Sequence, residues 1–380
     1  MIPKDLALPE NARPARALIA MSGGVDSSVA AHLVREAGLD PIGCTMRLFD
    51  NEAAGIESES GCCALSDVED ARQVAQKIGI PFYVFNYQDA FHTQVIDRFA
   101  QSYCCGKTPN PCIACNKYLK FGALLQRAFE LGCEYVATGH YARIDRDPES
   151  GEFLLKKALD PQKDQSYVLY DLTQETLAHV LFPLGGMKKE EVRALARECG
   201  FINAKKRESQ DICFAPDGDY AAAIRRHLAT LKPDQRNALS AQAFTPGDFV
   251  DADGRVLGCH RGLAHYTVGQ RKGLGISSPY PLYVQRLDAQ KNTVVLGKDE
   301  DLYAKEVFVQ NVNWIAQYPP EAPVRCKAKI RYRHTEQPCT VVRNDTRAQI
   351  VFDEPQRAPT PGQSAVFYDG EIVLGGGIIE

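Results

Sequence analysis

Short apolar runs alternate with segments of helical periodicity along the N-terminal part of the chain. The first apolar run, at residues 17–20, stops at a serine and two glycines, and helical periodicity follows at 27–36. This order predicts a strand, a tight loop and a helix. The same alternation predicts strands at 41–48, 81–87 and 134–138 and helices at 66–79, 91–103 and 119–131. Strands that alternate with helices are typical of a parallel sheet covered on both faces, so we expect a doubly wound α/β domain.

The pattern changes after residue 215. One more helix is predicted at 220–231, and a polar stretch follows it. From residue 249 onward, short strand-like runs are separated by glycine, proline and Asn-Asp turns, which is typical of an all-β region such as a small barrel. We therefore expect three domains, namely an α/β domain at 1–215, a small central α+β domain at 216–285 and a C-terminal β-barrel domain at 286–380.

Length and composition agree with this division. The chain has 380 residues, enough for two or three domains at roughly 100–200 residues each. No run of about 18 apolar residues occurs, so we expect no membrane span, and the first residues lack the apolar stretch of a signal peptide. We therefore expect a cytoplasmic protein with reduced cysteines. The formal net charge of −4 does not itself indicate nucleic-acid binding, so a polyanionic partner would need local basic patches.

The loop between the first predicted strand and helix reads Ser22-Gly23-Gly24-Val25-Asp26-Ser27-Ser28. Its glycines allow positive φ angles and close backbone approach, and its N–H groups with the helix N-terminus would form a phosphate site. The loop is not a Walker A motif, since no Gly-Lys-Ser/Thr sequence ends it, and it is not a GxGxxG motif. The alternative interpretation is a glycine-rich turn that binds no ligand.

This loop resembles the pyrophosphatase-type loop of ATP-dependent adenylating enzymes, which cleave ATP between the α- and β-phosphates and leave AMP on an oxygen. The resemblance implies that ATP is bound, that Asp26 contacts Mg²⁺ or pyrophosphate, and that Met46 lies beside the adenine. Gly139 follows a later strand at the same carboxyl edge of the sheet, where open sheets bind ligands. For Met46 alone, packing in the core is the alternative interpretation.

Cysteines in two segments could place thiols near such a site. Cys112 and Cys115 form a CxxC motif after two prolines, and we expect Cys115 near the start of a helix, where the dipole lowers the pKa of a thiol. Lys117 and Lys120 add positive charge. Cys213 lies in a second segment, after a basic run. Two thiols beside one ATP site suggest sulfur transfer, in which one carries a persulfide and the other resolves the bond by thiol–disulfide exchange.

The CxxC motif has other interpretations. A structural zinc site would need a second CxxC or a histidine pair, and a thioredoxin-like disulfide needs a different βαβ context. Cys112, Cys115 and Cys213 could instead bind three irons of a 4Fe–4S cluster and leave one iron open for sulfide, and the sequence alone does not choose between cluster and persulfide.

Most of the remaining cysteines among the 13 in the chain need no chemistry. We interpret five of them as small, buried, apolar side chains, namely Cys44, Cys133, Cys199, Cys326 and Cys339. The adjacent pair Cys62-Cys63 could relay sulfur, although packing is the favoured interpretation.

An ordered set of short motifs resembles the bacterial tRNA-specific 2-thiouridylase family over nearly the whole chain. The motifs are SGGVDSS, TPNPCIACN, ATGHYAR, KDQSY, SQDICF, TVGQRKGLGI, IRYRHT, TPGQSAVFY and GGGII. The resemblance implies an enzyme that binds the tRNAs for Lys, Glu and Gln. With ATP and Mg²⁺ it would adenylate the C2 oxygen of the wobble uridine, and sulfur from an upstream donor protein or sulfide source would then displace AMP.

By motif position, the resemblance implies roles for individual residues. ATP would be contacted by Ala20, Met21, Ser22, Gly23, Gly24, Val25, Asp26, Ser27, Met46 and Gly139. Cys115 would be the nucleophile and Cys213 the persulfide carrier. The tRNA or its target base would be contacted by Asn110, Pro111, Cys112, His140, Lys163, Asp164, Gln165, Arg331, Tyr332 and Gln363. Many members carry an aspartate, a candidate acid/base group, where this chain has Cys112. This difference weakens the simple two-cysteine persulfide interpretation and strengthens the cluster interpretation, and both stay open.

Five cations recur at every second position of a strand predicted at 324–333, namely Arg325, Lys327, Lys329, Arg331 and Arg333. On one strand they would project from one face, and a row of one sign predicts a surface that follows tRNA phosphates. A second basic cluster comprises Arg261, His265, Arg271 and Lys272. Base flipping is expected, because C2 is not reachable in a stacked anticodon. The alternative of a different class is an adenylating ligase for a small molecule, which leaves the basic row unexplained.

Overall fold

The computed structural model describes residues 14–49, 65–206, 208, 212–215, 217–234, 243–316 and 322–380. Within them, a parallel sheet has the strand order β3-β2-β1-β4-β7. Its strands are β1 (Arg16–Ala20), β2 (Asp40–Arg47), β3 (Phe82–Asn86), β4 (Tyr135–Thr138) and β7 (Val180–Leu181). The first four confirm the strands predicted from the hydrophobic pattern, and β7 joins one edge as a strand that the pattern did not predict.

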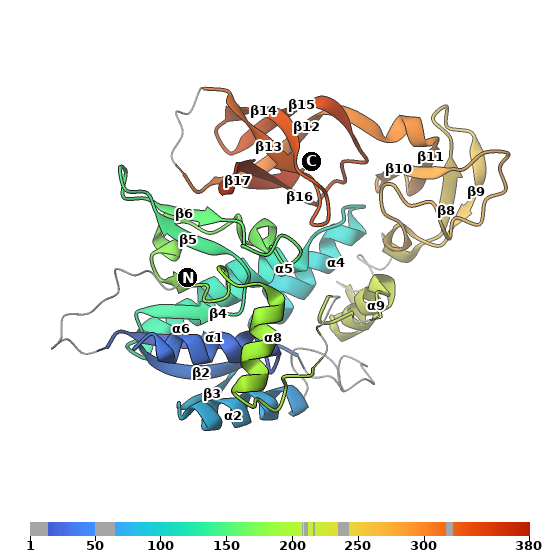
Figure 1. The fold of residues 1–380 in the computed structure, drawn as a ribbon. Coiled ribbons are helices and arrows are strands. Elements are labelled where there is room, and N and C mark those ends of the chain that lie inside the picture. The colour runs from blue at the N-terminus through green and yellow to red at the C-terminus, as the bar shows by residue number, and fades with distance from the viewer. Residues whose placement is uncertain are drawn as a thin grey trace.

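Helices cover both faces of this sheet (Figure 1). On one face lie α1 (Val25–Glu36), α2 (Leu65–Ile78) and α8 (Lys189–Glu198). On the other lie α3 (Gln88–Phe91), α4 (Asp97–Cys104), α5 (Pro111–Ala114), α6 (Leu124–Glu130) and α9 (Tyr220–Thr230). In β1, Leu18 belongs to one hydrophobic cluster, whereas Ala17 and Ile19 belong to the other. A strand buried on both faces is apolar at successive positions, so the doubly wound prediction is confirmed.

The helix predicted at 119–131 begins earlier than expected. It starts at Pro111, continues through a π-helical stretch at Cys115–Ala123 and ends with α6. Asn110 caps the start, because its side-chain oxygen accepts a hydrogen bond from the N–H of Cys112 at 3.0 Å. Proline at the first helical position loses no hydrogen bond. Pro111 therefore starts the helix instead of delaying it, and Cys115 lies beyond the first turn.

A smaller four-stranded sheet follows the α/β part. Its order is β10-β11-β8-β9, and its strands are β8 (Gly247–Val250), β9 (Val256–His260), β10 (Tyr283–Asp288) and β11 (Thr293–Gly297). Phe249, Val284 and Leu296 are among the residues that form its core. The boundary predicted after residue 285 falls inside β10, and the three-domain division itself stays a prediction.

The C-terminal strands close into a barrel. They are β12 (Tyr303–Trp314), β13 (Val324–Lys329), β14 (Gln337–Asn344), β15 (Arg347–Arg357), β16 (Ser364–Asp369) and β17 (Ile372–Ile379). Closure follows because β12 pairs with both β15 and β17. A hairpin from the α/β part, β5 (Arg143–Arg146) and β6 (Phe153–Lys156), extends this sheet, since Lys156 pairs with Ile372. The predicted barrel is therefore confirmed.

The barrel packs directly on the helical run that carries Cys115. Ile113 and Phe121 of that run share one hydrophobic cluster with Val366 and Tyr368 of β16. This contact places the barrel beside the carboxyl edge of the parallel sheet, as Figure 1 shows for β16 above α5.

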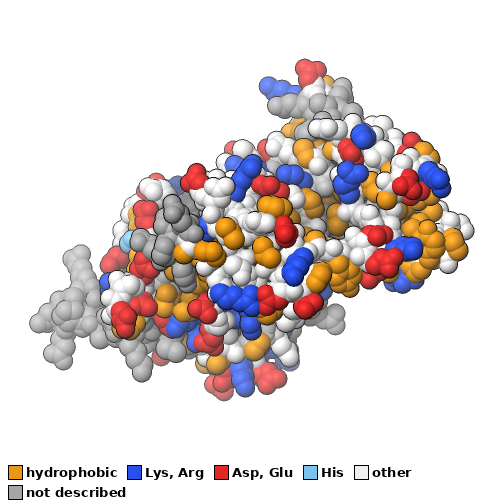
Figure 2. All heavy atoms as spheres, turned by 90° about the horizontal axis from the view of Figure 1, so that it is seen from above, with side chains coloured by type: hydrophobic (Ala, Val, Ile, Leu, Met, Phe, Trp, Pro, Cys, Tyr) orange, Lys and Arg blue, Asp and Glu red, His pale blue; other side chains and the backbone are white. Residues whose placement is uncertain are grey.

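The predicted row of five cations is interrupted. β13 ends at Lys329, so Arg331 and Arg333 lie in the turn that follows. The guanidinium of Arg331 donates hydrogen bonds to the carbonyl oxygens of Arg357 and Ala358 at 2.9 and 2.6 Å. These bonds draw Arg331 away from the exposed face of the strand. On the face seen in Figure 2, cationic and anionic side chains are interspersed.

The cysteines interpreted as core residues are mostly buried. Cys44, Cys133, Cys326 and Cys339 are buried, whereas Cys199 is partly exposed. The pair Cys62-Cys63 lies outside the described residues. In the part of the chain that the structure describes, no helix has the length and apolar character needed to cross a membrane.

Candidate active site

A pocket of about 340 Å³ lies at the carboxyl edge of the parallel sheet. Its walls come from the ends of β1, β2 and β4, the start of α1, the helical run after Asn110 and the segment at 212–214. It brings together many of the predicted residues: Ala20, Met21, Ser22, Asp26, Ser27, Met46, Pro111, Cys112, Cys115, Gly139, His140, Gln165 and Cys213. Segments far apart in sequence thus meet where open α/β sheets bind their ligands.

The glycine-rich loop is shaped by close backbone contacts. Gly23 has a φ of +74°, and a Cβ there would overlap the carbonyl oxygen of Asp67. A Cβ on Gly139 would lie 2.8 Å from the backbone nitrogen of Ser27, so the end of β4 passes directly over the loop. The amide of Asn203 donates hydrogen bonds to the carbonyl of Gly23 and to the hydroxyl of Ser28, both at 2.9 Å. The loop conformation therefore depends on contacts with later parts of the chain.

The first turn of α1 faces this pocket. Gly24 occupies the N-cap position without a side-chain cap, and Asp26 and Ser27 line the pocket. Helix N-termini attract anions through their free N–H groups and dipole. The arrangement is suited to holding phosphate groups, whereas Gly23, Gly24 and Val25 are not among the residues that line the pocket.

Asp26 takes part in an ion-pair network. Lys189 of α8, which is buried, donates to both carboxylate oxygens of Asp26 at 2.6 and 2.8 Å, and the hydroxyl of Tyr141 donates at 2.8 Å. Lys189 also contacts Glu208 at 2.8 Å, and Lys163 contacts Glu208 at 2.6 Å. Burial alone would raise the pKa of Glu208, but hydrogen bonds from Lys163 and Lys189 lower it to about 2. Lys163, predicted to contact tRNA, is thus engaged inside the molecule.

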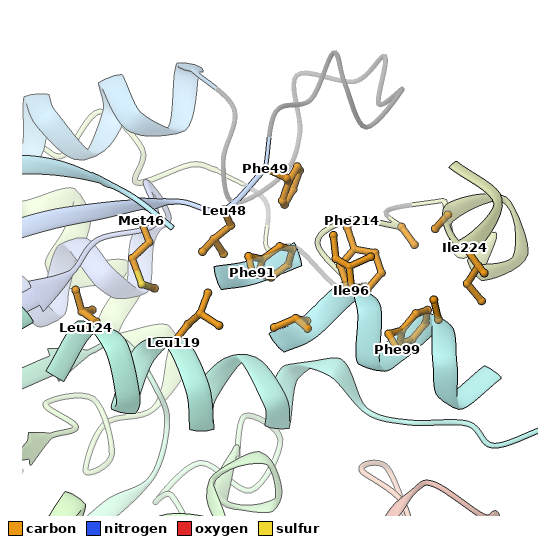
Figure 3. Close-up of a cluster of buried hydrophobic side chains, with 14 of the residues drawn as sticks. Met46, Leu48, Phe49, Phe91, Ile96, Phe99, Leu119, Leu124, Phe214 and Ile224 are labelled. Carbon is orange, nitrogen blue, oxygen red and sulfur yellow. The ribbon is translucent and has the colours of Figure 1, made fainter. Parts of the chain in front are cut away.

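One end of the pocket is apolar. Figure 3 shows Met46, Leu48, Phe91 and Leu119 within one cluster of buried side chains, and Met46, Leu48 and Phe91 also line the pocket. Two interpretations were open for Met46, packing in the core or contact with a base. The side chain packs in the core and also lines the pocket, so its position is compatible with both. This apolar end of the pocket is suited to an aromatic base.

The side chains of Cys112, Cys115 and Cys213 line the same pocket although they come from two segments. Cys115 lies at the start of the π-helical stretch, and such stretches frequently occur at functional sites. Cys213 precedes Phe214, whose ring packs edge-on against Phe91 and Phe99 at centroid distances of 6.0 and 5.2 Å. These aromatic contacts, visible in Figure 3, anchor the segment that carries Cys213.

A metal site requires several ligands that converge on one point. In the described ranges, no group of three or more His, Cys, Asp or Glu side chains is arranged to hold a metal ion. In a 4Fe–4S cluster, by contrast, each thiolate binds a different iron atom, so its ligands need not converge on one point. Cys112, Cys115 and Cys213 line one pocket, and the cluster on these three thiols stays a prediction.

His140 lies at the pocket wall but is buried. Its Nδ1 is 2.7 Å from the hydroxyl of Thr138, and its Nε2 is 3.5 Å from Nζ of Lys120. Burial lowers the pKa of His140 well below its usual value, and the Lys120 charge lowers it further. Both ring nitrogens therefore have partners within the protein.

The other predicted tRNA contacts lie outside the pocket and make internal bonds. The carboxylate of Asp164 accepts a hydrogen bond from the N–H of Ala158 at 3.0 Å, and its carbonyl accepts one from the hydroxyl of Tyr332 at 3.4 Å. The amide of Gln363 donates to the carbonyl of Thr108 at 2.7 Å. The bonds of Tyr332 and Gln363 tie the barrel to the α/β part, the second of them at Thr108, close to Asn110 in sequence.

Several site residues had no signal in the sequence. Asn203 and Lys189 fix the glycine-rich loop and Asp26, but neither lies in a motif with a known local pattern. Thr138 could have been found, because it directly precedes Gly139 at a strand end.

The sequence is similar to known protein families and to named proteins over nearly its whole length. Family models match residues 15–217, described as a tRNA methyl transferase HUP domain, 239–298, a tRNA methyl transferase PRC-barrel domain, and 304–379, an aminomethyltransferase β-barrel domain. The tRNA-specific 2-thiouridylase MnmA of Clostridioides difficile is 50% identical over 366 residues, covering 96% of this chain and 98% of that protein. The tRNA-specific 2-thiouridylase MnmA 2 of Caldanaerobacter subterraneus is 52% identical over 368 residues, with 96% and 98% covered.

Among solved structures, a 4-thiouridine synthetase–RNA complex with bound ATP aligns with a TM-score of 0.36 and 19% identity, over 60% of this chain and 50% of that chain. A likeness this weak carries no argument. Fold and pocket define the class, an α/β protein with a pocket at the carboxyl edge of its parallel sheet and two further β regions. The identity over nearly the full length then decides the family: the chain belongs to the tRNA-specific 2-thiouridylases.

Proposed function

We propose that the chain is an ATP-dependent tRNA-uridine 2-sulfurtransferase that acts on the wobble uridine of the tRNAs for Lys, Glu and Gln. The observation that carries this proposal is that residues of the glycine-rich loop line one pocket together with Cys115 and Cys213. A ligase for a small molecule has no use for two thiols at its phosphate site. The names of relatives that are 50% and 52% identical support the same activity.

ATP would bind with its phosphates at the loop that includes Ser22 and Ser27 and its adenine against Met46. Mg²⁺ usually takes one or two carboxylates together with substrate phosphates, and Asp26 is a pocket carboxylate that fits this requirement. When bound there, the ion would neutralise charge on the phosphates. Lys189 would hold the Asp26 carboxylate in place at the pocket wall.

The proposed chemistry has two stages. The C2 oxygen of the uridine attacks the α-phosphorus of ATP, and pyrophosphate leaves with the electron pair of the broken bond. The terminal sulfur of a persulfide on Cys213 then attacks C2 and expels AMP. The thiolate of Cys115 attacks the Sγ of Cys213, which releases 2-thiouridine and leaves a disulfide between the two cysteines. A reductant and a sulfur-donor protein restore the persulfide, and the cytoplasm stays the predicted location.

Two cysteine variants test the proposal in an assay with tRNA, ATP and a persulfide donor. Cys115→Ser and Cys213→Ser should each abolish 2-thiouridine formation, because serine neither carries nor resolves a persulfide. ATP-dependent adenylation of the tRNA should persist in both. Cys259→Ser, which changes an exposed thiol in β9, serves as the control and should thiolate normally. Unchanged thiolation in both pocket variants would overturn the proposal.

The variant Cys112→Asp distinguishes the persulfide mechanism from a mechanism that needs a 4Fe–4S cluster. The residue is exposed in the first turn of its helix, where a carboxylate is favourable by about 0.3–1 kcal/mol. The persulfide account predicts that this variant still thiolates tRNA and that anaerobically purified protein contains no stoichiometric iron or sulfide. Iron bound in the wild type and lost in the variant, together with lost activity, would show that the cluster is required.

A further inference from the structure

Lys120 differs from the neighbouring lysines in its surroundings. It lies in the π-helical stretch at Cys115–Ala123 and lines the pocket together with Cys115. In the ranges that the structure covers, no carboxylate lies within 4.0 Å of its Nζ, the limit for an ion pair. By contrast, Lys117 on the same stretch pairs with Asp171 at 2.7 Å, and Lys189 is shared between two carboxylates. Lys120 therefore brings a positive charge to the pocket without a carboxylate among the described residues to neutralise it.

His140 fixes the direction of this charge. An ammonium group has no lone pair, so in the 3.5 Å contact Lys120 donates and Nε2 of His140 accepts. The proton of the neutral ring then lies on Nδ1, which donates to the hydroxyl of Thr138 at 2.7 Å. Phe121 and Phe182 pack against the ring at centroid distances of 5.9 and 5.8 Å. The ring is held on several sides, and its lowered pKa keeps it uncharged beside the lysine.

A cation beside apolar walls is stabilised best when an anion lies next to it. Ser22 and Ser27 of the glycine-rich loop line the same pocket, and under the proposed function this loop would bind phosphate groups. Loop and helix N-terminus would take the outer phosphates of ATP, which leaves the α-phosphate facing the remaining pocket wall. Cys115 and Lys120 belong to that wall, where the uridine must also approach.

We propose that Lys120 is a further catalytic residue, whose ammonium binds the α-phosphate and stabilises the charge that develops there during adenylation, with His140 as its positioning residue. This inference rests on the proposed function. In the step, the bond from the uridine C2 oxygen to the α-phosphorus forms and the bond to the bridging oxygen breaks. Pyrophosphate takes the electron pair, and the uridine N3 proton passes to water. Lys120 keeps its protons throughout and acts by its charge.

Lys120→Met tests this role, because it keeps the chain length and removes the charge. The adenylation rate, measured as label transferred from the α-phosphate of ATP to tRNA, should fall about 100-fold, as for the loss of one group that stabilises transition-state charge. Lys120→Arg should restore part of the rate. Lys117→Met, in which the lost cation pairs with Asp171 outside the pocket lining, should adenylate like the wild type.

Two readouts distinguish charge stabilisation by Lys120 from activation of the Cys115 thiol. If Lys120 only activates the thiol, Lys120→Met should slow the alkylation of Cys115 and leave adenylation intact. A fall in the adenylation rate, measured also in Cys115→Ser so that the thiol plays no part, shows that Lys120 stabilises charge on the phosphate. Wild-type adenylation by Lys120→Met would overturn the inference, while absence of adenylation in the wild type would overturn the proposed function instead.

If the Lys120→Met variant does not fold, the Thr138→Val variant tests the same role. This substitution is nearly isosteric and removes the hydroxyl that accepts from His140. It should slow adenylation without weakening tRNA binding. An unchanged adenylation rate would contradict the proposal that Thr138 and His140 position Lys120 through hydrogen bonds.

Discussion

Two basic regions of this molecule differ in what surrounds their charges. At the pocket, Lys120 has a neutral histidine as its neighbour and lines the same cavity as Ser22 and Ser27 of the glycine-rich loop. In the barrel, Arg325 forms paired contacts with Asp353, and Lys329 lies 4.0 Å from Asp164. A cation already paired with a carboxylate has less to gain from a phosphate, because part of its charge is neutralised. The number of cations in a segment is thus a weaker guide to anion binding than the partners that the fold gives them.

Lys189→Met should have the largest effect on stability. Lys189 neutralises Asp26 and Glu208 while it is itself buried. Removing it leaves Asp26 without a counter-charge among the described residues, while Glu208 keeps its contact with Lys163. We expect a loss of about 3 kcal/mol in the free energy of unfolding. Chemical denaturation measures this loss, with the exposed Lys188→Met as the control. A loss equal to that of the control would show that the network contributes nothing.

The pH dependence of this network has a definite sign. The pKa of Glu208 in the folded protein is about 2, below its ordinary value of 4.5. The stabilisation by its charge is therefore complete above pH 4.5 and is lost as the pH falls toward 2. We expect the stability difference between the wild type and Glu208→Gln to shrink over this interval in denaturation experiments. A difference that stays constant would mean that Glu208 stabilises the fold by packing alone.

Gln363→Ala should affect catalysis more than binding. Gln363 holds the carbonyl of Thr108, and the N–H of Thr108 donates to the carbonyl of Pro361 at 2.8 Å. The loop before Asn110 is thus fixed to the barrel. Its displacement should slow thiolation about 10-fold, because small shifts of reacting groups are costly, while tRNA affinity changes little. Gln349→Ala, on an exposed part of β15, is the control. Weaker tRNA binding with an unchanged rate would instead support the tRNA contact expected from the sequence.

We expect the smallest effect, on tRNA binding, from the cations of β13 in the barrel. Lys327 is exposed on β13 between the paired residues Arg325 and Lys329. Lys327→Gln should weaken tRNA binding modestly and lower the slope of affinity against salt by about 0.7–0.9 if the residue contacts one phosphate. Arg325→Gln, the matched variant, should change the slope less because of Asp353. Equal slopes in both variants would contradict the difference drawn between Lys327 and its paired neighbours.

Local patterns carried much of the prediction. The strand, glycine-rich loop and helix at residues 16–36 follow from an apolar run, two glycines and a helical period, and the structure confirms them. The position of Gly139 at a strand end placed it at the correct edge of the sheet. These features depend on residues close together in sequence, so a pattern can reveal them.

Features that depend on distant contacts were not predictable. The pairing of β6 with β17 joins residues 156 and 372, and no local pattern encodes it. Arg331 continues the alternation of the cationic row, yet hydrogen bonds to Arg357 and Ala358 take it off that face. Lys189 reaches Asp26 only through the packing of α8 against α1. In each case a tertiary contact overrides or adds to what the local sequence indicates.

The most direct test of adenylation in this pocket uses ATP labelled at the α-phosphate and a Cys115→Ser, Cys213→Ser double variant. Without the thiols that supply and release sulfur, the adenylated tRNA should persist long enough to be isolated. We predict that label accumulates on tRNA in the double variant, whereas the wild type releases it as AMP and forms 2-thiouridine when a persulfide donor is present. Label that never reaches tRNA, in a double variant that still binds ATP and tRNA, would contradict a pocket that activates the uridine by adenylation.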